Sequence, residues 1–194
     1  MAQDLIEQAV NCMHAVWPAC LRAIPDFTND YINGRNEYKL AVPGFSQTEW
    51  YSCGFTAALS AVRTFHPRAN SQKLYRDCNP LPFEGTTETK LVRGGLRRNG
   101  VGVSVQSNLN YARVRAVIES GFPIIATIGH EYSDGAHWVV IYGIGWRPNR
   151  VFLCNHVNCG WAGFSREELT WEEFRALWNP RGRGLVCWGK RLSR

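Results

Sequence analysis

Apolar residues recur at helical spacing in the first part of the chain. Residues 3–22 carry such a stripe and are predicted to form an N-terminal helix that ends before Pro25. Residues 26–46 contain Asn, Asp, Gly and Pro with little periodicity, so we interpret them as a loop. The chain thus begins with one helix and a long connection.

A second long helix is predicted to begin at Cys53. Apolar side chains from Phe55 to Phe65 mark one face of it, at a spacing of three and four residues. Ser52 fits the N-cap position, and Pro67 ends the helix because proline disrupts the helical hydrogen-bond ladder. Cys53 is therefore placed in the first turn of a helix.

Shorter helices are predicted near residues 71–77, 87–98 and 110–120. Thr86 or Thr87 is expected to cap the middle one, and Gly100 is expected to stop it.

The second half of the chain predicts a sheet. Short segments rich in β-branched and aromatic residues are separated by Gly, Pro, Asn and Asp. They are Phe122–Ile128, His137–Ile144, Val151–Asn155 and Leu185–Lys190. A helical stretch is predicted between the last two, over Ser165–Trp178. Helices that come first and strands that come later indicate an α+β fold with two unlike halves.

Length and charge narrow the class of protein. The 194 residues are enough for one domain or for two small lobes that share a cleft. The net charge of +6 comes from basic residues spread along the chain, without a dense run or a recognisable nucleic-acid-binding module. No nucleic-acid partner is therefore expected.

The cysteines and the N-terminal residues bear on where in or outside the cell the protein is expected. The seven cysteines include no C-x-x-C pair, which favours free thiols in a reducing environment. The N-terminal segment carries acids and has no Lys or Arg before Arg22, so it does not read as a secretory signal peptide. The longest apolar stretch, Trp138–Trp146, is too short to span a bilayer, and no stable membrane insertion is expected. The expected location is the cytoplasm, or outside the cell by a signal-peptide-independent route.

Cys53 is the candidate nucleophile. It is the only cysteine at the predicted start of a long helix, where the helix dipole and the first-turn N–H groups favour a thiolate. A buried, inert thiol is the alternative reading of the same position. Gln47, on the loop six residues before Cys53, is the candidate second donor to an oxyanion, beside the backbone N–H of the nucleophile.

His137 is the candidate base among the five histidines. It opens the most hydrophobic predicted strand, at the rim of a core, and a core histidine is the alternative reading. An imidazole base needs its second nitrogen fixed by an amide or a carboxylate. Asn155 ends the next strand and would lie beside His137 if the two strands form an antiparallel pair. Asn158 and Asp134 are weaker rivals for this role.

These residues resemble a known family. Gln47 with Cys53, "HWVVIYGI" at 137–144 and "VFLCN" at 151–155 resemble the papain-like cysteine peptidases. The nearest branch is the bacteriocin-leader-processing, double-glycine type with its stand-alone relatives, and some plant-pathogen effector proteases are similar. "VRAVIESGFPIIATI" and "FSREELTWEEFRALWN" extend the resemblance over residues 43–178.

The resemblance implies a fold and an organisation. A helical lobe over 43–120, bearing Cys53, would pack on an antiparallel sheet lobe over 121–194, with residues 1–40 as a helical extension of a single catalytic domain. It also implies that Gln47 serves as the oxyanion donor. The branch usually has Asp-Pro where this chain has Asn155 and His156.

The function implied is hydrolysis of a protein or peptide substrate through a thioester. A transglutaminase, an acyltransferase or an inactive binding module on the same fold are the alternatives. No cofactor and no metal are expected. Two clusters, Cys154 with His156 and Cys159, and Cys12 with His14 and Cys20, lack the tight ligand pairs of a structural zinc site.

Overall fold

The computed structural model describes residues 36–130, 133–156, 165–178 and 181–189. The chain divides into two compact units, Met1–Arg35 and Asn36–Arg194. The helix predicted over 3–22 falls in the first unit and lies outside the described residues. All four candidate catalytic residues lie in the second unit.

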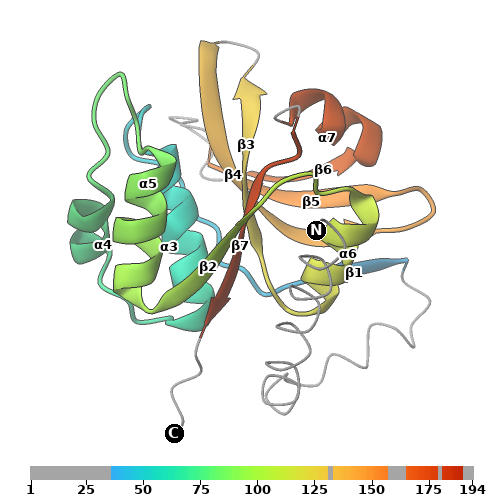
Figure 1. Ribbon diagram of the computed structural model, residues 1–194, viewed down its shortest axis with the longest axis horizontal. Helices are drawn as coiled ribbons and strands as arrows, with labels where there is room; N and C mark the ends of the chain where they lie inside the picture. Colours follow the sequence, from blue (N-terminus) through green and yellow to red (C-terminus); the bar gives the residue numbers. More distant parts are fainter. Residues whose placement is uncertain (1–35, 131–132, 157–164, 179–180, 190–194) are drawn as a thin grey trace, which may run out of the picture. The chain divides into compact units, whose positions relative to one another are not determined.

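Helix α3 (Cys53–Phe65) packs on the sheet through small side chains. Ala57, Ala58 and Ala61 on this helix have no exposed surface, so the helix backbone approaches strand β4 closely. Helix α4 and three shorter helical segments complete the helical part of the molecule beside α3 (Figure 1). They are α4 (Ser71–Cys78), α5 (Glu88–Lys90), η2 (Leu91–Leu96) and η3 (Arg97–Asn99).

The helices predicted from Cys53 and over 71–77 are confirmed as α3 and α4, and the one predicted over 87–98 is a continuous run of the α-helical turn α5, the π-helix η2 and the 3₁₀ helix η3. The side chain of Thr87 accepts a hydrogen bond from the Lys90 backbone N–H, so Thr87 rather than Thr86 is the cap. Gly100 follows the last helical turn in the left-handed conformation, with φ of 80°, which a residue without Cβ adopts at little cost. The helix predicted over 110–120 is α6 (Tyr111–Glu119).

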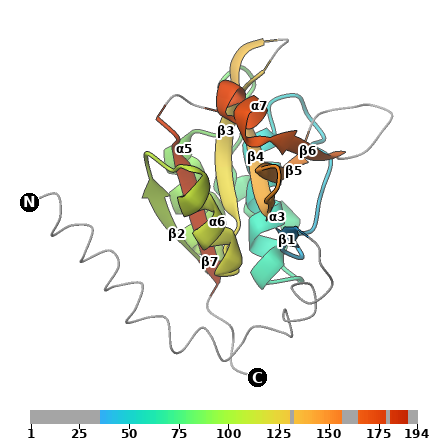
Figure 2. The same ribbon diagram turned by 90° about the vertical axis from the view of Figure 1, so that its right-hand side faces the viewer.

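The sheet contains seven antiparallel strands in the described part of the chain. Their order is β2-β7-β3-β4-β5-β6, and β1 pairs with β4. Helices α3 and α6 lie on opposite faces of the sheet (Figures 1 and 2). The strands are β1 (Glu37–Lys39), β2 (Val101–Gln106), β3 (Ile124–His130), β4 (Ser133–Gly145), β5 (Arg150–Asn155), β6 (Ser165–Thr170) and β7 (Gly184–Gly189).

The helix predicted over Ser165–Trp178 is half wrong. Ser165–Thr170 forms β6, which pairs with β5, and only Trp171–Leu177 forms a helix, α7. The hydroxyl of Thr170 accepts from the Glu173 backbone N–H, and the Glu173 carboxylate accepts from the Thr170 backbone N–H. This capping box starts the helix at Trp171 and releases the preceding residues to form an edge strand.

Two further strands lie where none was predicted. Strand β1 falls inside the predicted loop 26–46, and β2 falls inside the range 43–120 assigned to the helical lobe. Both pair with partners far along the chain, β4 and β7, so their strand conformation depends on contacts that a local pattern does not reveal.

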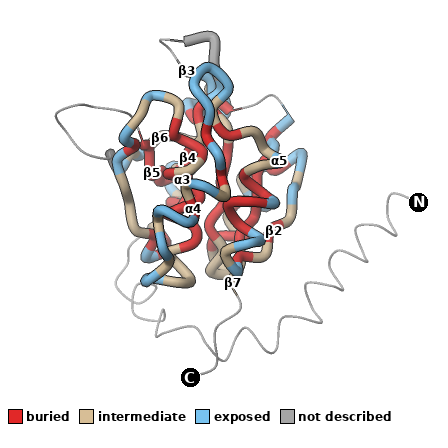
Figure 3. The backbone as a smooth tube through the Cα atoms, turned by 90° about the vertical axis from the view of Figure 1, so that its left-hand side faces the viewer, coloured by how far each residue is buried: buried red, intermediate tan, exposed pale blue. Residues whose placement is uncertain are grey.

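The core of the described unit lies between α3 and the central strands. Figure 3 shows buried backbone concentrated there and exposed backbone in the outer loops. Ile124, Ile125, Val139, Val140 and Ile141 are fully buried on β3 and β4. Among the described residues, no helix combines the length and apolar character needed to cross a membrane. The α+β prediction is confirmed.

Candidate active site

Cys53 is the first residue of α3 and lies where this helix meets β4. Its thiol is buried, with 8% of the residue exposed. Burial raises the pKa of the Cys53 thiol, although hydrogen bonds from the backbone N–H groups of Trp138, Gly54 and Cys53 itself act in the opposite direction. The N–H groups at the helix start favour the thiolate as expected, but the loss of water has the larger effect and keeps the thiol protonated. Cys53 needs a base.

Ser52 precedes the helix as predicted but does not cap it through its side chain. Its hydroxyl instead donates to the Glu49 carbonyl at 2.8 Å and accepts from the Glu49 backbone N–H at 3.2 Å. These bonds close the turn that leads from Gln47 into α3.

His137 and Asn155 form a direct hydrogen bond. Strands β4 and β5 pair so that Val139 lies opposite Asn155, which places His137 on the same face, two residues along. The His137 Nε2 to Asn155 Oδ1 distance is 2.9 Å, and both residues are buried. The backbone N–H of the next residue, Trp138, bonds to the Cys53 thiol. The structure therefore places the Cys53 thiol against the backbone of β4, one residue along the strand from the imidazole that bonds to Asn155.

Gln47 is buried on the loop that leads into α3. Its Nε2 donates to the Trp50 carbonyl at 3.4 Å. A carboxamide nitrogen carries two hydrogens, and within the described residues the second one has no acceptor. Within the described residues the Oε1 of the same amide is also buried without a hydrogen-bond partner.

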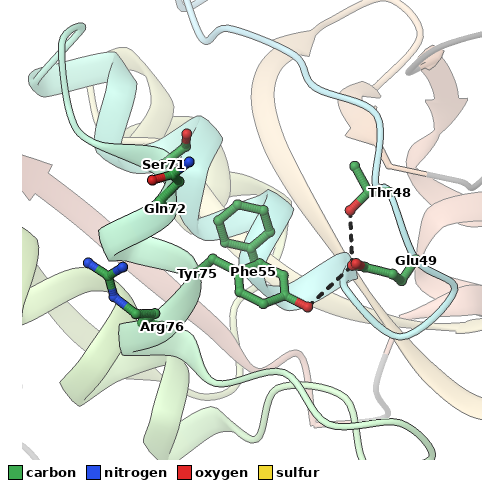
Figure 4. A pocket seen from close by; sticks show the side chains of 7 residues that line it. All are labelled: Thr48, Glu49, Phe55, Ser71, Gln72, Tyr75 and Arg76. Carbon is green, nitrogen blue, oxygen red and sulfur yellow. Dashed lines mark hydrogen bonds between the residues drawn. The ribbon is translucent and has the colours of Figure 1, made fainter.

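The loop that carries Gln47 is anchored on its other side by Glu49. This carboxylate accepts hydrogen bonds from the Thr48 hydroxyl at 2.9 Å and from the Tyr75 hydroxyl at 3.4 Å. Burial raises the pKa of Tyr75 to about 12, so the phenol stays protonated and remains a donor. These groups line a hollow of about 440 Å³ between the loop, α3 and α4 (Figure 4).

Trp138 closes the space beside the nucleophile. A Cβ on Gly54 would lie 2.7 Å from the Thr86 Cβ and 3.0 Å from the Trp138 ring, so only glycine fits after Cys53 without displacement. The Trp138 Nε1 donates to the Thr86 carbonyl at 3.0 Å and fixes the indole in this place. Trp50 is exposed, and Trp161 lies outside the described residues.

The alternative candidates for the base and for its orienting residue lie away from this site or outside the described residues. Asn158 and the side chain of Asp134 are not among the described groups. His66 follows α3 as its C-cap, and its Nε2 lies 3.3 Å from the Gly100 carbonyl. Among the described residues, no cluster of three His, Cys, Asp or Glu side chains could hold a metal ion, and Cys12, His14, Cys20 and Cys159 fall outside them.

His156 has a structural role that the sequence did not assign. It has no exposed surface, and its Nδ1 lies 2.8 Å from the Phe45 carbonyl, two residues before Gln47. This contact ties the end of β5 to the loop of Gln47. Burial lowers the pKa of His156 to about 4, and the nearby His137 adds to the decrease, so the ring is neutral at pH 7 and donates through Nδ1–H.

Replacing His156 with glutamine is expected to flatten the acid dependence of stability. The ordinary pKa of 6.5 applies in the unfolded chain, which therefore binds more protons than the folded chain between pH 6.5 and about 4. Lowering the pH through this window should cost the wild type about 3 kcal/mol of unfolding free energy that the His156→Gln variant does not lose. Urea unfolding at a series of pH values measures the difference, with His66→Gln as the matched histidine replacement. Equal pH dependence in wild type and His156→Gln would contradict the assignment.

Comparisons with known proteins identify the family and the fold. The fold and the site together define a papain-like cysteine peptidase. The sequence profile of the Peptidase_C39 like family matches residues 39–186, so the chain belongs to that family and is a cysteine peptidase. A comparison with curated protein sequences gives no significant match.

Solved structures with the same fold share little sequence with this chain. A double glycine motif protease from an AMS/PCAT transporter, solved in complex with its leader peptide, is 16% identical, with a TM-score of 0.58 over 81% of this chain and 96% of its own. The peptidase domain of Streptococcus ComA, a bifunctional ABC transporter involved in quorum sensing, is 14% identical, with a TM-score of 0.60 over 76% and 98%. A C39-like peptidase from Bacillus anthracis is 13% identical, with a TM-score of 0.60 over 79% and 99%. These likenesses show the fold.

Proposed function

We propose that this peptidase cuts its substrate through a thioester on Cys53, with His137 as base, Asn155 as the residue that orients the base, and Gln47 as an oxyanion donor. The observation that carries the proposal is the 2.9 Å bond from His137 to Asn155, on a strand whose next residue bonds to the Cys53 thiol. A base and its orienting amide thus stand beside the thiol of a cysteine peptidase.

The reaction follows from these positions. His137 Nδ1 takes the thiol proton as Cys53 Sγ attacks the peptide carbonyl carbon, and the oxyanion accepts from the spare N–H of Gln47 and from the Cys53 backbone N–H. The C–N bond breaks as the imidazolium gives its proton to the leaving amine, which leaves a thioester on Cys53. His137 then activates a water that attacks the thioester and releases the acid and the thiol.

The proposed substrate is a peptide with small residues at the scissile bond, of the leader type that the AMS/PCAT protease binds. Trp138 and Thr86 fill the space next to Gly54, directly after the nucleophile. This arrangement leaves little room beside Cys53 and favours substrate residues with small side chains.

An exposed aromatic pair supports a second substrate contact. Trp50 is 59% exposed and Phe83 is 93% exposed, and their rings meet at a centroid distance of 5.5 Å. Trp50 lies three residues before Cys53, and Phe83 lies three residues before Thr86, which contacts Gly54. Exposed apolar groups that cluster beside a reactive centre favour contact with apolar side chains of a ligand. We therefore propose that the substrate also carries an apolar residue near the scissile bond, which contacts these two rings.

Phe83→Ser is expected to raise KM for substrates with an apolar residue near the cut by about tenfold, because losing one ring contact is worth roughly 1.5 kcal/mol. The turnover number kcat should stay unchanged, since the ring does not touch the reacting atoms. Val105→Ser, on the edge strand β2, removes another exposed apolar side chain and serves as the control.

The function is tested by a peptide library that varies the residues around the cut, read by mass spectrometry. Wild-type protein should release two fragments whose masses sum to that of the substrate plus one water. Cross-linked or acylated products without free acid ends would instead establish acyl transfer. An equal KM for wild type and Phe83→Ser across the whole library would remove the aromatic pair from the substrate site.

A further inference from the structure

A carboxylate stands behind the amide that orients the base. Asn155 Nδ2 donates to Glu167 Oε1 at 2.8 Å, while Oδ1 of the same amide lies 2.9 Å from His137 Nε2. Strand β6 pairs with β5 so that Leu153 lies opposite Glu167 and Asn155 lies opposite Ser165. Glu167 is therefore diagonal to Asn155 across the two strands, at a position from which a long side chain reaches its neighbour.

This contact decides which end of the amide faces the imidazole. The two ends of an asparagine amide have nearly the same shape, but one only accepts hydrogen bonds and the other only donates them. An ionised carboxylate only accepts, so Glu167 binds the Nδ2 end and turns Oδ1 toward His137. The orientation is thus fixed by chemistry rather than by packing.

The amide in turn decides where the imidazole proton sits. Since Oδ1 accepts from Nε2–H, the neutral ring of His137 carries its hydrogen on Nε2 and a lone pair on Nδ1. If the amide were reversed, Nδ2 would donate to Nε2, the hydrogen would move to Nδ1, and that nitrogen would no longer accept the thiol proton. An imidazole held in the wrong tautomer loses most of its function as a base.

We propose that Glu167 is a positioning residue, the fourth member of a chain that runs Cys53, His137, Asn155, Glu167. It holds the Asn155 amide in the productive orientation, and its negative charge favours the imidazolium that forms when His137 takes the thiol proton. The inference rests on the proposed roles of Cys53 and His137. It adds to these residues the negative charge of the Glu167 carboxylate, which the neutral Asn155 amide does not supply.

The strand offers a matched control. Glu168, the next residue, is on the exposed side of β6 and forms an ion pair with Arg150. Glu168→Ala removes the same side chain from the same strand without touching the amide. Glu167→Ala is expected to lower kcat about 10- to 100-fold with KM unchanged, while Glu168→Ala keeps wild-type kcat.

Exchanging the two groups separates orientation and charge from packing. Asn155→Asp alone places two carboxylates at hydrogen-bond distance, which is unfavourable and forces one to take a proton. Adding Glu167→Gln lets the new carboxamide donate to the new carboxylate, which then accepts from His137 Nε2–H. The double variant should therefore recover at least about tenfold in kcat over Asn155→Asp, an effect that a role in packing alone does not predict.

The assay uses full-length protein and pairs peptide cleavage with the rate of Cys53 alkylation by iodoacetamide. Thermal unfolding of each variant is measured alongside, so that only folded protein is compared. Wild-type kcat in Glu167→Ala, or a double variant no better than Asn155→Asp, would overturn the inference while cleavage by wild type still supports the proposed function. If wild type cleaves no peptide, the proposed function fails, and alkylation still decides: slower Cys53 alkylation in Glu167→Ala supports the chain of four residues, and an equal rate overturns it.

Discussion

Cys53→Ala should lower kcat for peptide cleavage by at least about 10⁴-fold. The variant cannot form the thioester, and the remaining groups then have no nucleophile to activate. The change is small and lies at the start of α3, where alanine preserves the helix, so binding of the peptide should persist. Single-turnover cleavage assays and a binding measurement on the same peptide give the two results.

The rate of alkylation at limiting reagent measures the reactivity of Cys53 independently of peptide cleavage. Cys78, Cys154 and Cys187 have no exposed surface, and burial raises their pKa values to about 12, about 11 and about 12. Cys53 retains some exposure and its thiol accepts from backbone N–H groups that favour the thiolate, so it should react first among these four.

Cys78→Ala is the matched control for kcat, because Cys78 lies on α4 and takes no part in the proposed reaction. Its replacement leaves the nucleophile in place, and the kcat of Cys78→Ala should equal that of the wild type. Cleavage that persists in Cys53→Ala, or equal alkylation of Cys53 and Cys78, would remove Cys53 from its assigned role.

Local patterns were sufficient to predict the central part of the site. The helix that begins at Cys53 and the strand that bears His137 both follow from short-range spacing, and the structure has both. The packing of this helix on the sheet was implied by the resemblance to the papain-like peptidases. The place of Asn155 beside His137 followed from one further step, since consecutive strands often pair in antiparallel fashion and bring the end of one beside the start of the other. Asn155 was found in this way, and its bond to His137 is present.

The protonation of Cys53 and the position of Glu167 required three-dimensional information. The pKa of the Cys53 thiol depends on how much water the fold removes from it. This burial raises the pKa more than the N–H groups at the helix start lower it, and only the helix start can be recognised in the sequence. Glu167 was hidden inside a predicted helix, because its segment is rich in Glu and Leu, which favour helices. The Thr170–Glu173 capping box was the readable signal that the helix begins later, at Trp171.

His137→Ala should lower kcat at neutral pH by at least about 10³-fold and change how the remaining activity depends on pH. Without the imidazole, Cys53 reacts only as the thiolate that solvent produces, and burial holds the pKa of this thiol above its ordinary value of 9.0. Residual cleavage and alkylation should therefore rise about tenfold for each pH unit from pH 7 to 9, since the thiolate fraction does so below the pKa.

The variant Cys53→Ala/His137→Ala should be no slower than Cys53→Ala alone, because the two groups act as one unit. His66→Ala, at the end of α3, controls for the loss of a histidine. A pH profile in His137→Ala that is parallel to the wild type would show that another group takes the thiol proton.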